Sequence, residues 1–461
     1  NIKSNIFVCL LVTKPIPFYE EVLNSFYSLS YDKSLITLMI NIDPCVGLIY
    51  TEIVDKINNF IKENKNKYKQ IILRNLHEKS AKEISCFEIM INNNGYRYDY
   101  EYCLYIENGI VFNTLDLIEI LISRKKNVIT THLDKNNKIW CNFNSLIDDD
   151  GSPLYNKCDK YIANLERKGI WNVPYIDSLL FINCDIFKEY GNLFSNNDNY
   201  NDDKNIVFCN NLRKQGIFMY IDNFAEYGKV ICPDGFESWI SENKNIPNKE
   251  LSNSRENPFA WEKKYLHKDF YDFLNKGKEL EIEEICNDAY SFPLFSEIFC
   301  KELIENCENF GKWSGGTGHN KDQRISGGYE SHPTKDIHLT QLNLNDSWNN
   351  IVMEYIAKIA SKVYGNYLTK CTNINFVVRY KKDEQCKLEP HHDSSSYTAN
   401  IALNKKGIDF EGGGCKFIRQ NIEYHNTKPG FCCIHPGKLT HYHEGLQTTS
   451  GIRYILVSFI E

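Results

Sequence analysis

The spacing of apolar residues changes along the chain, and this change constrains the fold more than any other feature. In the first half, the apolar runs Ile6–Val12 and Leu35–Ile42 flank an amphipathic stretch, Phe18–Leu29. That order predicts β-strands alternating with helices, as in an α/β sheet. Near the C-terminus, short alternating segments are separated by turn residues, which predicts a β-sandwich or small barrel. We therefore expect an α/β domain followed by a mostly β domain.

A polar stretch, Pro233–Asn257, separates the two patterns and carries few periodic apolar positions. We place the domain boundary there, which gives residues 1–250 and 251–461. A length of 461 residues suits two domains better than one core. Aromatic residues make up 13% of the chain, so both domains are expected to bury folded cores.

Further segments fit this division. In the first domain, the strand Tyr102–Ile106 runs into Glu107-Asn108-Gly109, a helical pattern follows at Thr114–Ser123, and Ile217–Ile221 forms a later strand. The second domain opens with aromatic-rich helical stretches at Trp261–Leu274 and Leu294–Glu308. Its expected strands are Asn375–Tyr380, Tyr397–Leu403, Gly414–Ile418, Phe431–His435, Leu439–His443 and Arg453–Ile460.

The charge balance excludes two classes of partner. The net charge is -7 at pH 7 and no block of Lys and Arg stands out, so nucleic acid and anionic membrane surfaces are poor partners. No apolar run reaches the roughly 18 residues of a membrane-spanning helix. A basic polypeptide substrate suits this chain better.

The 17 cysteines are scattered without a Cys-x-x-Cys pair, which argues against a structural zinc site. We expect some disulfides and, because the count is odd, at least one unpaired thiol. Cys415 is expected to be a packed thiol, and the glycines Gly412–Gly414 before it are expected to permit close strand packing or a bulge. His392 and His441 are expected to be structural or surface residues. The sequon Asn345-Asp346-Ser347 fits a secretory compartment.

Candidate metal ligands lie in the second domain. His391 and Asp393 are two residues apart, so both side chains project to the same side of an extended segment. About one His-x-Asp pair is expected by accident in a chain with 12 histidines. Further along come His443, a turn rich in Thr, Ser and Gly, and Arg453. We expect a hairpin there that sets His443 beside Arg453 on adjacent strands.

This combination has a chemical reason. Two imidazoles and one carboxylate on a single face leave three positions of an octahedral Fe(II) open for a 2-oxo acid and O2. The Arg453 fork would bind the far carboxylate of 2-oxoglutarate through paired charge-assisted hydrogen bonds. The alternative is that His391 and Asp393 form a surface turn and that His443 bonds a carbonyl in a strand. The order of all four residues favours the metal site.

Several blocks of the second domain resemble the catalytic domain of the procollagen-lysine 5-dioxygenases, the lysyl hydroxylases. They are Gly311–Gly316, Arg324–Glu330, Pro390–Asp393, Asn400–Asn404, Glu411–Cys415 and His435–Gly445. By this resemblance His391, Asp393 and His443 match the iron ligands of the family, and Arg453 matches its 2-oxoglutarate arginine. The chain is identified as a divergent member of the family, with a viral source as one option.

The resemblance implies a double-stranded β-helix (jelly-roll) domain that hydroxylates lysine to 5-hydroxylysine in collagen or collagen-like X-Lys-Gly sequences. The reaction would use Fe(II) and O2, convert 2-oxoglutarate to succinate and CO2, and need ascorbate to rescue oxidised iron. The resemblance also implies a homodimer, with Leu439 as a candidate contact. The compartment implied is the endoplasmic reticulum lumen or the secretory pathway, or a host-cell compartment for a viral member.

The first domain resembles the accessory domain of the same enzymes, which has a glycosyltransferase-like (GT-A type) α/β fold. The blocks Gly169–Ile176 and Gly216–Ile221 carry this resemblance. A working GT-A transferase needs an Asp-x-Asp turn to hold Mn2+ and the sugar diphosphate. Here that position reads Glu107-Asn108-Gly109, so we expect an inactive domain. Two alternatives stay open for the chain: a glycosyltransferase acting on hydroxylysine, and a non-catalytic collagen-binding module.

Overall fold

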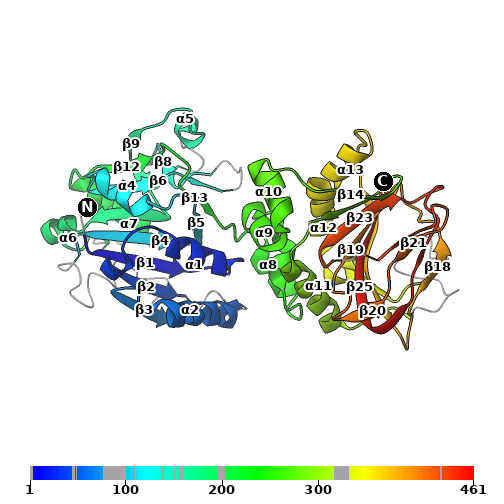
Figure 1. Ribbon diagram of the computed structural model, residues 1–461. Helices are drawn as coiled ribbons and strands as arrows, with labels where there is room; N and C mark the ends of the chain where they lie inside the picture. Colours follow the sequence, from blue (N-terminus) through cyan, green and yellow to red (C-terminus); the bar gives the residue numbers. More distant parts are fainter. Residues whose placement is uncertain are drawn as a thin grey trace. The chain divides into compact units, whose positions relative to one another are not determined.

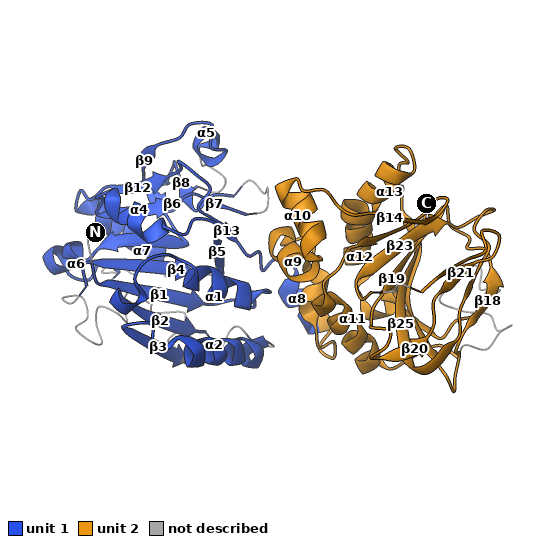
Figure 2. Cartoon of the chain, viewed as in Figure 1, with its two compact units in different colours: residues 1–241 blue, residues 242–461 orange. Residues whose placement is uncertain are grey.

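The chain divides into two compact units, Asn1–Ser241 and Glu242–Glu461 (Figure 2). The computed structural model describes residues 4–43, 47, 49–75, 100–107, 109–135, 140–149, 151–154, 159–194, 203–315, 332–425 and 428–461. The division falls before the expected boundary at residue 250, because the polar stretch Pro233–Asn257 is not a linker. It contains the helix α8 (Phe236–Glu242) and the 3-10 helix η4 (Lys249–Asn253), and each buries apolar side chains.

The first unit is built on an eight-stranded sheet with the order β3-β2-β1-β4-β11-β6-β12-β9 (Figure 1). These strands are β1 (Ile6–Val12), β2 (Ile36–Ile42), β3 (Gln70–Asn75), β4 (Tyr102–Glu107), β6 (Val128–Thr131), β9 (Ile170–Val173), β11 (Leu179–Asn183) and β12 (Met219–Asp222). Strands β1 to β4 pair in parallel, whereas β11 runs antiparallel to β4 and β6. Every residue of β1 and β2 is buried, as expected for parallel strands covered on both faces.

Helices and two small sheets complete the first unit. The helices are α1 (Tyr19–Tyr27), η1 (Lys33–Leu35), α2 (Tyr50–Asn64), α4 (Leu117–Ser123), α5 (Lys160–Ala163), α6 (Asp185–Tyr190), α7 (Lys204–Lys214) and α8. The small sheets pair β5 (Ile110–Phe112), β13 (Gly228–Val230) and β7 (Leu133–Asp134), and β10 (Tyr175–Ile176) with β8 (Phe143–Asn144). Val22, Leu23 and Phe26 form the buried face of α1, so the expected amphipathic helix is confirmed.

The second unit contains two β-sheets. The larger has eight strands: β14 (Glu283–Cys286), β15 (Ala289–Pro293), β23 (Phe431–Pro436), β19 (Tyr397–Ala402), β25 (Thr448–Ile460), β17 (Thr372–Lys381) and β16 (Asp336–His338) in that order, with β20 (Phe410–Gly412) paired to β25. The smaller has the order β18 (Leu388–His391), β24 (His443–Gly445), β21 (Cys415–Phe417) and β22 (Ile422–Tyr424). The expected α/β unit followed by a mostly β unit is therefore confirmed.

Helices pack against the larger sheet of the second unit (Figure 1). They are η4, α9 (Pro258–Tyr265), α10 (Lys268–Lys276), α11 (Glu297–Phe310), η5 (Leu339–Leu342), α12 (Asn345–Ile351), the π-helical turn η6 (Val352–Ile356) and α13 (Ala357–Val363). Trp261 of α9 is 0% exposed and stacks on Tyr355, with ring centroids 5.8 Å apart. Asn345 of the sequon opens α12, and its side-chain oxygen accepts a hydrogen bond from Asn375 Nδ2 at 3.0 Å.

Strand β25 separates the helical layer from the interior between the sheets. Arg453, Ile455, Val457 and Phe459 line a cavity, whereas Leu456 and Ser458 between them are both 0% exposed. Ser458 Oγ accepts a hydrogen bond from Trp348 Nε1 of α12 at 2.7 Å, so this second face of β25 meets the helices. The alternation follows the two-residue period of a strand. One strand therefore serves both the hydrophobic core and the cavity.

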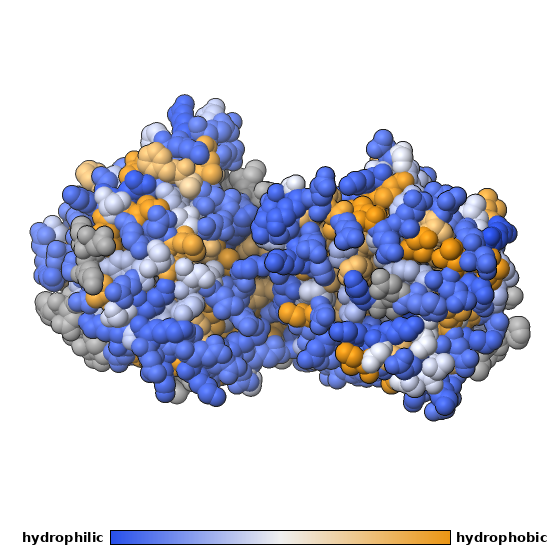
Figure 3. All heavy atoms as spheres, viewed as in Figure 1, coloured by the Kyte–Doolittle hydropathy of each residue, from blue (hydrophilic) through white to orange (hydrophobic). Residues whose placement is uncertain are grey.

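The expected absence of a membrane-spanning helix and the expected disulfides can both be compared with the structure. Hydrophilic residues predominate on the face seen in Figure 3, and hydrophobic residues form separate patches on it. None of the described helices combines the length and the apolar character needed to cross a membrane. The cysteines within the described residues are all free, so the expected disulfides are not found among them.

Replacement of Leu456 by alanine should lower the free energy of unfolding by about 2–5 kcal/mol, because it leaves a cavity between β25 and the helices. The matched control is Leu368→Ala, since Leu368 is 81% exposed and its loss should cost less than about 0.5 kcal/mol. Urea unfolding of both variants checks the difference. Equal losses would contradict the assignment of Leu456 to the core.

Candidate active site

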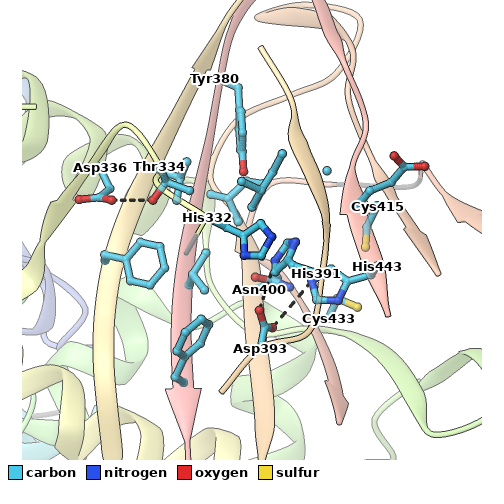
Figure 4. A pocket seen from close by; sticks show the side chains of 18 of the residues that line it. His332, Thr334, Asp336, Tyr380, His391, Asp393, Asn400, Cys415, Cys433 and His443 are labelled. Carbon is cyan, nitrogen blue, oxygen red and sulfur yellow. Dashed lines mark hydrogen bonds and ion pairs between the residues drawn. The ribbon is translucent and has the colours of Figure 1, made fainter. Parts of the chain in front are cut away.

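A cavity of about 290 Å³ lies between the two sheets of the second unit. Alternate residues of β17 and β25 form one wall, and residues of β18, β21 and β24 form the other. Figure 4 shows His391, Asp393 and His443 together in this cavity, with His332 beside them and Tyr380 further along. The volume suits a small organic acid and one substrate side chain.

His391, Asp393 and His443 form a cluster of potential metal ligands, as the sequence predicts. All three are buried, and one ligand atom from each lies within 4.8 Å of the others. Within the described part of the chain, this is the only group of three such residues found at that spacing. His391 and His443 are direct partners across the antiparallel pair β18–β24, and their ring centroids are 4.4 Å apart. Strand register therefore brings together two residues far apart in sequence.

Backbone carbonyls orient both imidazoles. His391 Nδ1 lies 2.7 Å from the carbonyl oxygen of Glu389, and His443 Nδ1 lies 2.8 Å from that of His441. Because a carbonyl oxygen only accepts, each Nδ1 must carry the hydrogen. In the neutral rings the Nε2 atoms then keep their lone pairs, and both lie near Asp393, at 3.3 Å from Oδ1 for His391 and 3.8 Å from Oδ2 for His443. This is the tautomer that metal-binding histidines need.

The protonation states also suit metal binding. Burial by itself would raise the pKa of Asp393, but the hydrogen bond with His391 and the charges of His443 and His435 hold that pKa well below its usual range. Burial lowers the pKa of His443, which favours the neutral imidazole. Burial also opposes the charge on His391, but the hydrogen bond to Asp393 outweighs it and raises the pKa. A cation in this site would replace that proton.

Arg453 faces the cluster from the other sheet, and the expected hairpin is therefore wrong. Strand β24 pairs with β18 and β21, whereas β25 pairs with β17, β19 and β20. His443 and Arg453 thus lie in different sheets and line one cavity from opposite walls. The expected strand Leu439–His443 is also wrong, because β24 spans His443–Gly445 and overlaps the expected strand only at His443. The short turn holds Leu439 in a left-handed conformation, φ 68°, and leaves it 81% exposed.

Arg453 is a buried cation with room for an anion. It is 5% exposed, and its Nη1 donates to the carbonyl oxygen of Gly414 at 3.1 Å. Among the described residues no carboxylate forms an ion pair with it, and burial lowers its pKa. A Cβ on Gly413 would lie 2.9 Å from Arg453 Cδ, so the glycine makes space for the side chain. A buried guanidinium without a protein counter-ion suits a carboxylate ligand.

The donor set therefore fits Fe(II) and 2-oxoglutarate. Two imidazole nitrogens and one carboxylate oxygen are the ligand types that non-haem Fe(II) oxygenases use, and they converge here without any further protein ligand in the described cluster. The cavity continues from these ligands to Arg453. A 2-oxo acid that bound the metal at one end would meet a guanidinium at the other.

The remaining expectations for this region have mixed outcomes. The bulge at Gly412 is confirmed, because the register between β20 and β25 shifts there and all three glycines have positive φ. Cys415 is half-buried, and burial raises its pKa to about 12, so it is an unreactive thiol that lines the cavity. His392 is exposed and lies beside Arg419. His441 donates from Nε2 to the carbonyl oxygen of Asn287 and accepts at Nδ1 from the hydroxyl of Thr440, so neither ring nitrogen is directed at the cluster.

Sequence reasoning missed several residues that support the ligands. His435 is 0% exposed, lies with its ring 4.7 Å from that of His443, and contacts Asn400 Nδ2 through its Nε2 at 3.2 Å. Thr398 donates a hydrogen bond of 2.6 Å to Asp393 Oδ2. His435 and Thr398 both belong to strands expected from the sequence. Each lies two residues from a residue that lines the cavity, Cys433 and Asn400, and this spacing was the available signal that they face inward.

The first unit has a cluster of acids that sequence reasoning also missed. Glu107 ends β4, and Asp177 and Asp203 are close enough to influence it. Burial and these two carboxylates raise the pKa of Glu107 to about 7, and burial raises the pKa of Asp177 to about 6. Asn205 Nδ2 donates to Glu107 Oε2 at 3.5 Å. The ligand atoms of these acids do not form a group as tight as the histidine cluster in the described residues.

Two family models match the chain. Residues 4–246 match "Glycosyltransferase family 25, N-terminal domain", and residues 368–461 match "2OG-Fe(II) oxygenase superfamily". The first match covers the α/β unit and the second covers the strands β17 to β25 that surround the cavity. The expected fold class is confirmed: a GT-A-like domain precedes a jelly-roll dioxygenase domain.

Curated relatives match across both units. A Homo sapiens protein, "Procollagen-lysine,2-oxoglutarate 5-dioxygenase 2", is 34% identical over 100% of this chain and 60% of its own length. A Gallus gallus protein, "Procollagen-lysine,2-oxoglutarate 5-dioxygenase 1", is 40% identical over 79% of this chain and 48% of its own. The Homo sapiens "Multifunctional procollagen lysine hydroxylase and glycosyltransferase LH3" is 37% identical over 78% and 48%. The chain spans about half the length of most of these relatives.

The raised pKa of Glu107 predicts a pH-dependent stability of the first unit. With a folded pKa of about 7 and an unfolded pKa near 4.3, the folded state holds a proton that the unfolded state releases between these values. Its contribution to stability therefore falls as pH rises from about 4 to about 7. Glu107→Gln should stabilise the protein at pH 8 and have little effect near pH 4.5, as measured by urea unfolding.

Exposed Glu63 provides the control for this experiment, because Glu63→Gln should change stability little at either pH. A gain for Glu107→Gln that was the same at both pH values would contradict the assignment.

Proposed function

Because this chain belongs to the procollagen-lysine 5-dioxygenase family, we propose that it hydroxylates peptidyl lysine to 5-hydroxylysine. Residues 4–246 also belong to glycosyltransferase family 25. The proposed substrate is collagen or a collagen-like chain with X-Lys-Gly sequences. One observation carries the proposal. The cluster His391, Asp393 and His443 shares a single cavity with Arg453, a buried cation that lacks a carboxylate partner among the described residues.

In this proposal His391, Asp393 and His443 hold Fe(II). Bound iron supplies the oxidation, in which O2 and 2-oxoglutarate yield the hydroxyl group, succinate and CO2, and ascorbate restores iron that has become oxidised. The carbonyls of Glu389 and His441 keep the imidazole Nε2 atoms turned toward the metal position. The protein thus fixes the ligands before the metal arrives.

Arg453 is proposed to bind the far carboxylate of 2-oxoglutarate. Its fixed fork donates paired hydrogen bonds, and Tyr380 and Phe410 flank the guanidinium at 5.8 and 5.9 Å. The apolar walls from Val457 and Phe459 exclude water from the same cavity and strengthen these contacts. The substrate lysine would enter through the remaining space between the sheets.

The first unit is proposed to be accessory and inactive as a transferase. The Asp-x-Asp turn is replaced by Glu107-Asn108-Gly109, and Glu107 holds a proton for much of the time at neutral pH because its pKa is about 7. Both features weaken binding of a cation and a sugar diphosphate. Release of a nucleoside diphosphate from a UDP-sugar by the first unit would contradict this assignment.

Two further parts of the proposal rest on the relatives. Their names give procollagen as the substrate, and this supports the secretory pathway, including the endoplasmic reticulum lumen, as the compartment. A homodimer is proposed with Leu439 as a contact, because this large apolar side chain is 81% exposed on a tight turn.

The central test is the gain of one oxygen on lysine in a collagen-like Gly-X-Lys peptide, followed by mass spectrometry. Wild type should add the oxygen only with Fe(II), 2-oxoglutarate and O2, and His391→Ala should lose the activity because one of three ligands is absent. The control His425→Ala removes a histidine that is half-exposed and outside the cavity, so it should remain active. Peptide binding without any oxygen gain would support the non-catalytic alternative instead.

Replacement of Arg453 by lysine should weaken the use of 2-oxoglutarate. Loss of the paired geometry should cost about 1.5–3 kcal/mol, which corresponds to a roughly ten- to 100-fold higher KM for 2-oxoglutarate. The turnover at saturating 2-oxoglutarate should fall much less, since the metal ligands remain. An unchanged KM would show that the far carboxylate binds elsewhere.

A further inference from the structure

Two buried hydroxyl groups lie beside Asp393 and have no role in the steps described above. Thr398 Oγ1 lies 2.6 Å from Asp393 Oδ2, and Ser395 Oγ lies 2.7 Å from Thr398 Oγ1. Ser395 and Thr398 are both 0% exposed. The three groups therefore form a continuous chain of hydrogen bonds inside the protein.

The direction of this chain follows from its chemistry. An ionised carboxylate only accepts hydrogen bonds, so the single hydroxyl hydrogen of Thr398 must point to Asp393. Thr398 then has no hydrogen left for Ser395, and its oxygen must accept the hydrogen of the serine hydroxyl. Donation thus runs from Ser395 to Thr398 and from Thr398 to Asp393.

We propose that Ser395 and Thr398 are positioning residues that select which oxygen of Asp393 binds the metal. This inference rests on the proposed function. Thr398 occupies Oδ2 with a short charge-assisted hydrogen bond. Oδ1 lies 3.3 Å from His391 Nε2, whereas Oδ2 is farther from the other ligand, at 3.8 Å from His443 Nε2. Oδ1 is therefore the metal-binding atom, and Asp393 binds through this one oxygen.

Asp393 needs this support because its backbone lies outside the sheet. Strand β18 ends at His391, so no strand pairing fixes the residues that follow it. A carboxylate on such a segment has several rotamers, and the hydroxyl of Thr398 on β19 removes that freedom. The hydrogen bond thus ties a turn to the larger sheet.

The far end of the hydroxyl chain is itself anchored. The carbonyl oxygen of Ser395 accepts from the backbone N–H of Lys438 at 3.0 Å, and Ser396 N–H donates to the carbonyl of Ile460 at 3.0 Å. These bonds connect the turn after Asp393 to the ends of β23 and β25. The hydroxyl chain therefore starts from a fixed point.

Gly437 permits this anchoring. A Cβ at position 437 would lie 2.2 Å from Ser395 Oγ and 2.5 Å from the carbonyl oxygen of Ser395. Neither distance is possible without movement of the turn, and the second contact involves backbone. The glycine belongs to the block His435–Gly445 singled out in the sequence, where neither the metal nor 2-oxoglutarate requires it.

The test measures metal affinity in metal-free protein, titrated with Mn2+ and followed by the electron paramagnetic resonance signal of the free ion. Thr398→Val keeps the shape of the side chain and removes the hydroxyl, so Mn2+ binding should weaken roughly ten- to 100-fold. Thr398→Ser restores the hydroxyl and should restore the affinity. The exposed strand residue Thr449 supplies the matched control, since Thr449→Val should bind as wild type does.

Thermal unfolding of the metal-free variants separates positioning from general stability. A hydroxyl that only stabilises the fold would lower the unfolding temperature of Thr398→Val without a change in the affinity of the folded protein. If Thr398→Val does not fold, Ser395→Ala decides, because it leaves the Thr398 hydroxyl without its donor and should weaken Mn2+ binding by a smaller factor.

Asp393→Ala distinguishes failure of this inference from failure of the proposed function. If Asp393→Ala loses Mn2+ but Thr398→Val, or Ser395→Ala in its place, binds as wild type does, the positioning role is overturned and the metal site stands. If wild type binds no Mn2+, or Asp393→Ala binds as wild type does, the metal site itself is wrong and the positioning role falls with it.

Discussion

The antiparallel pairing of β18 with β24 is the constraint on which the candidate site depends. It sets His391 directly opposite His443, although more than fifty residues separate them in the sequence. The carbonyls that hold the Nδ1 atoms come from Glu389 within β18 and from His441, two residues before β24. The ladder thus sets the separation of the two imidazoles, and these carbonyls set their tautomer and direction. Asp393 completes the cluster from the turn that follows β18.

The larger sheet contributes a positive charge, the guanidinium of Arg453. Arg453 reaches the cavity from β25 and finds no carboxylate of the described residues to pair with, so it stays available for an anionic ligand. Burial of this cation is unfavourable by itself, but two glycines reduce its effect. Gly413 has no side chain to collide with Arg453, and the carbonyl oxygen of Gly414 accepts a hydrogen bond from the guanidinium. The two histidines therefore come from the smaller sheet, Asp393 from the turn after β18 and Arg453 from the larger sheet, and Asp393 forms no ion pair with Arg453.

Much of this arrangement is predictable from sequence, for a local reason. Strands such as Ile6–Val12 and Tyr397–Ala402 have strong apolar patterns, and the identities of His391, Asp393, His443 and Arg453 follow from residue order and resemblance. The hairpin between His443 and Arg453 was wrong, because local spacing does not reveal which sheet a strand joins. Thr398 was missed because its spacing from Asn400 shows only that it faces inward, and does not show that it lies within hydrogen-bond distance of Asp393.

Strand β25 has one property that reaches beyond the chemistry. Its odd-numbered residues from Arg453 to Phe459 face the cavity, while Leu456 and Ser458 meet the helices. Inserting or deleting a single residue of the strand before Arg453 would exchange the two faces of β25. The guanidinium would then point toward the helices, and an aliphatic side chain would point into the cavity. The segment therefore tolerates substitution better than any change of length, and an added or lost residue can be accommodated only in the loops that flank it.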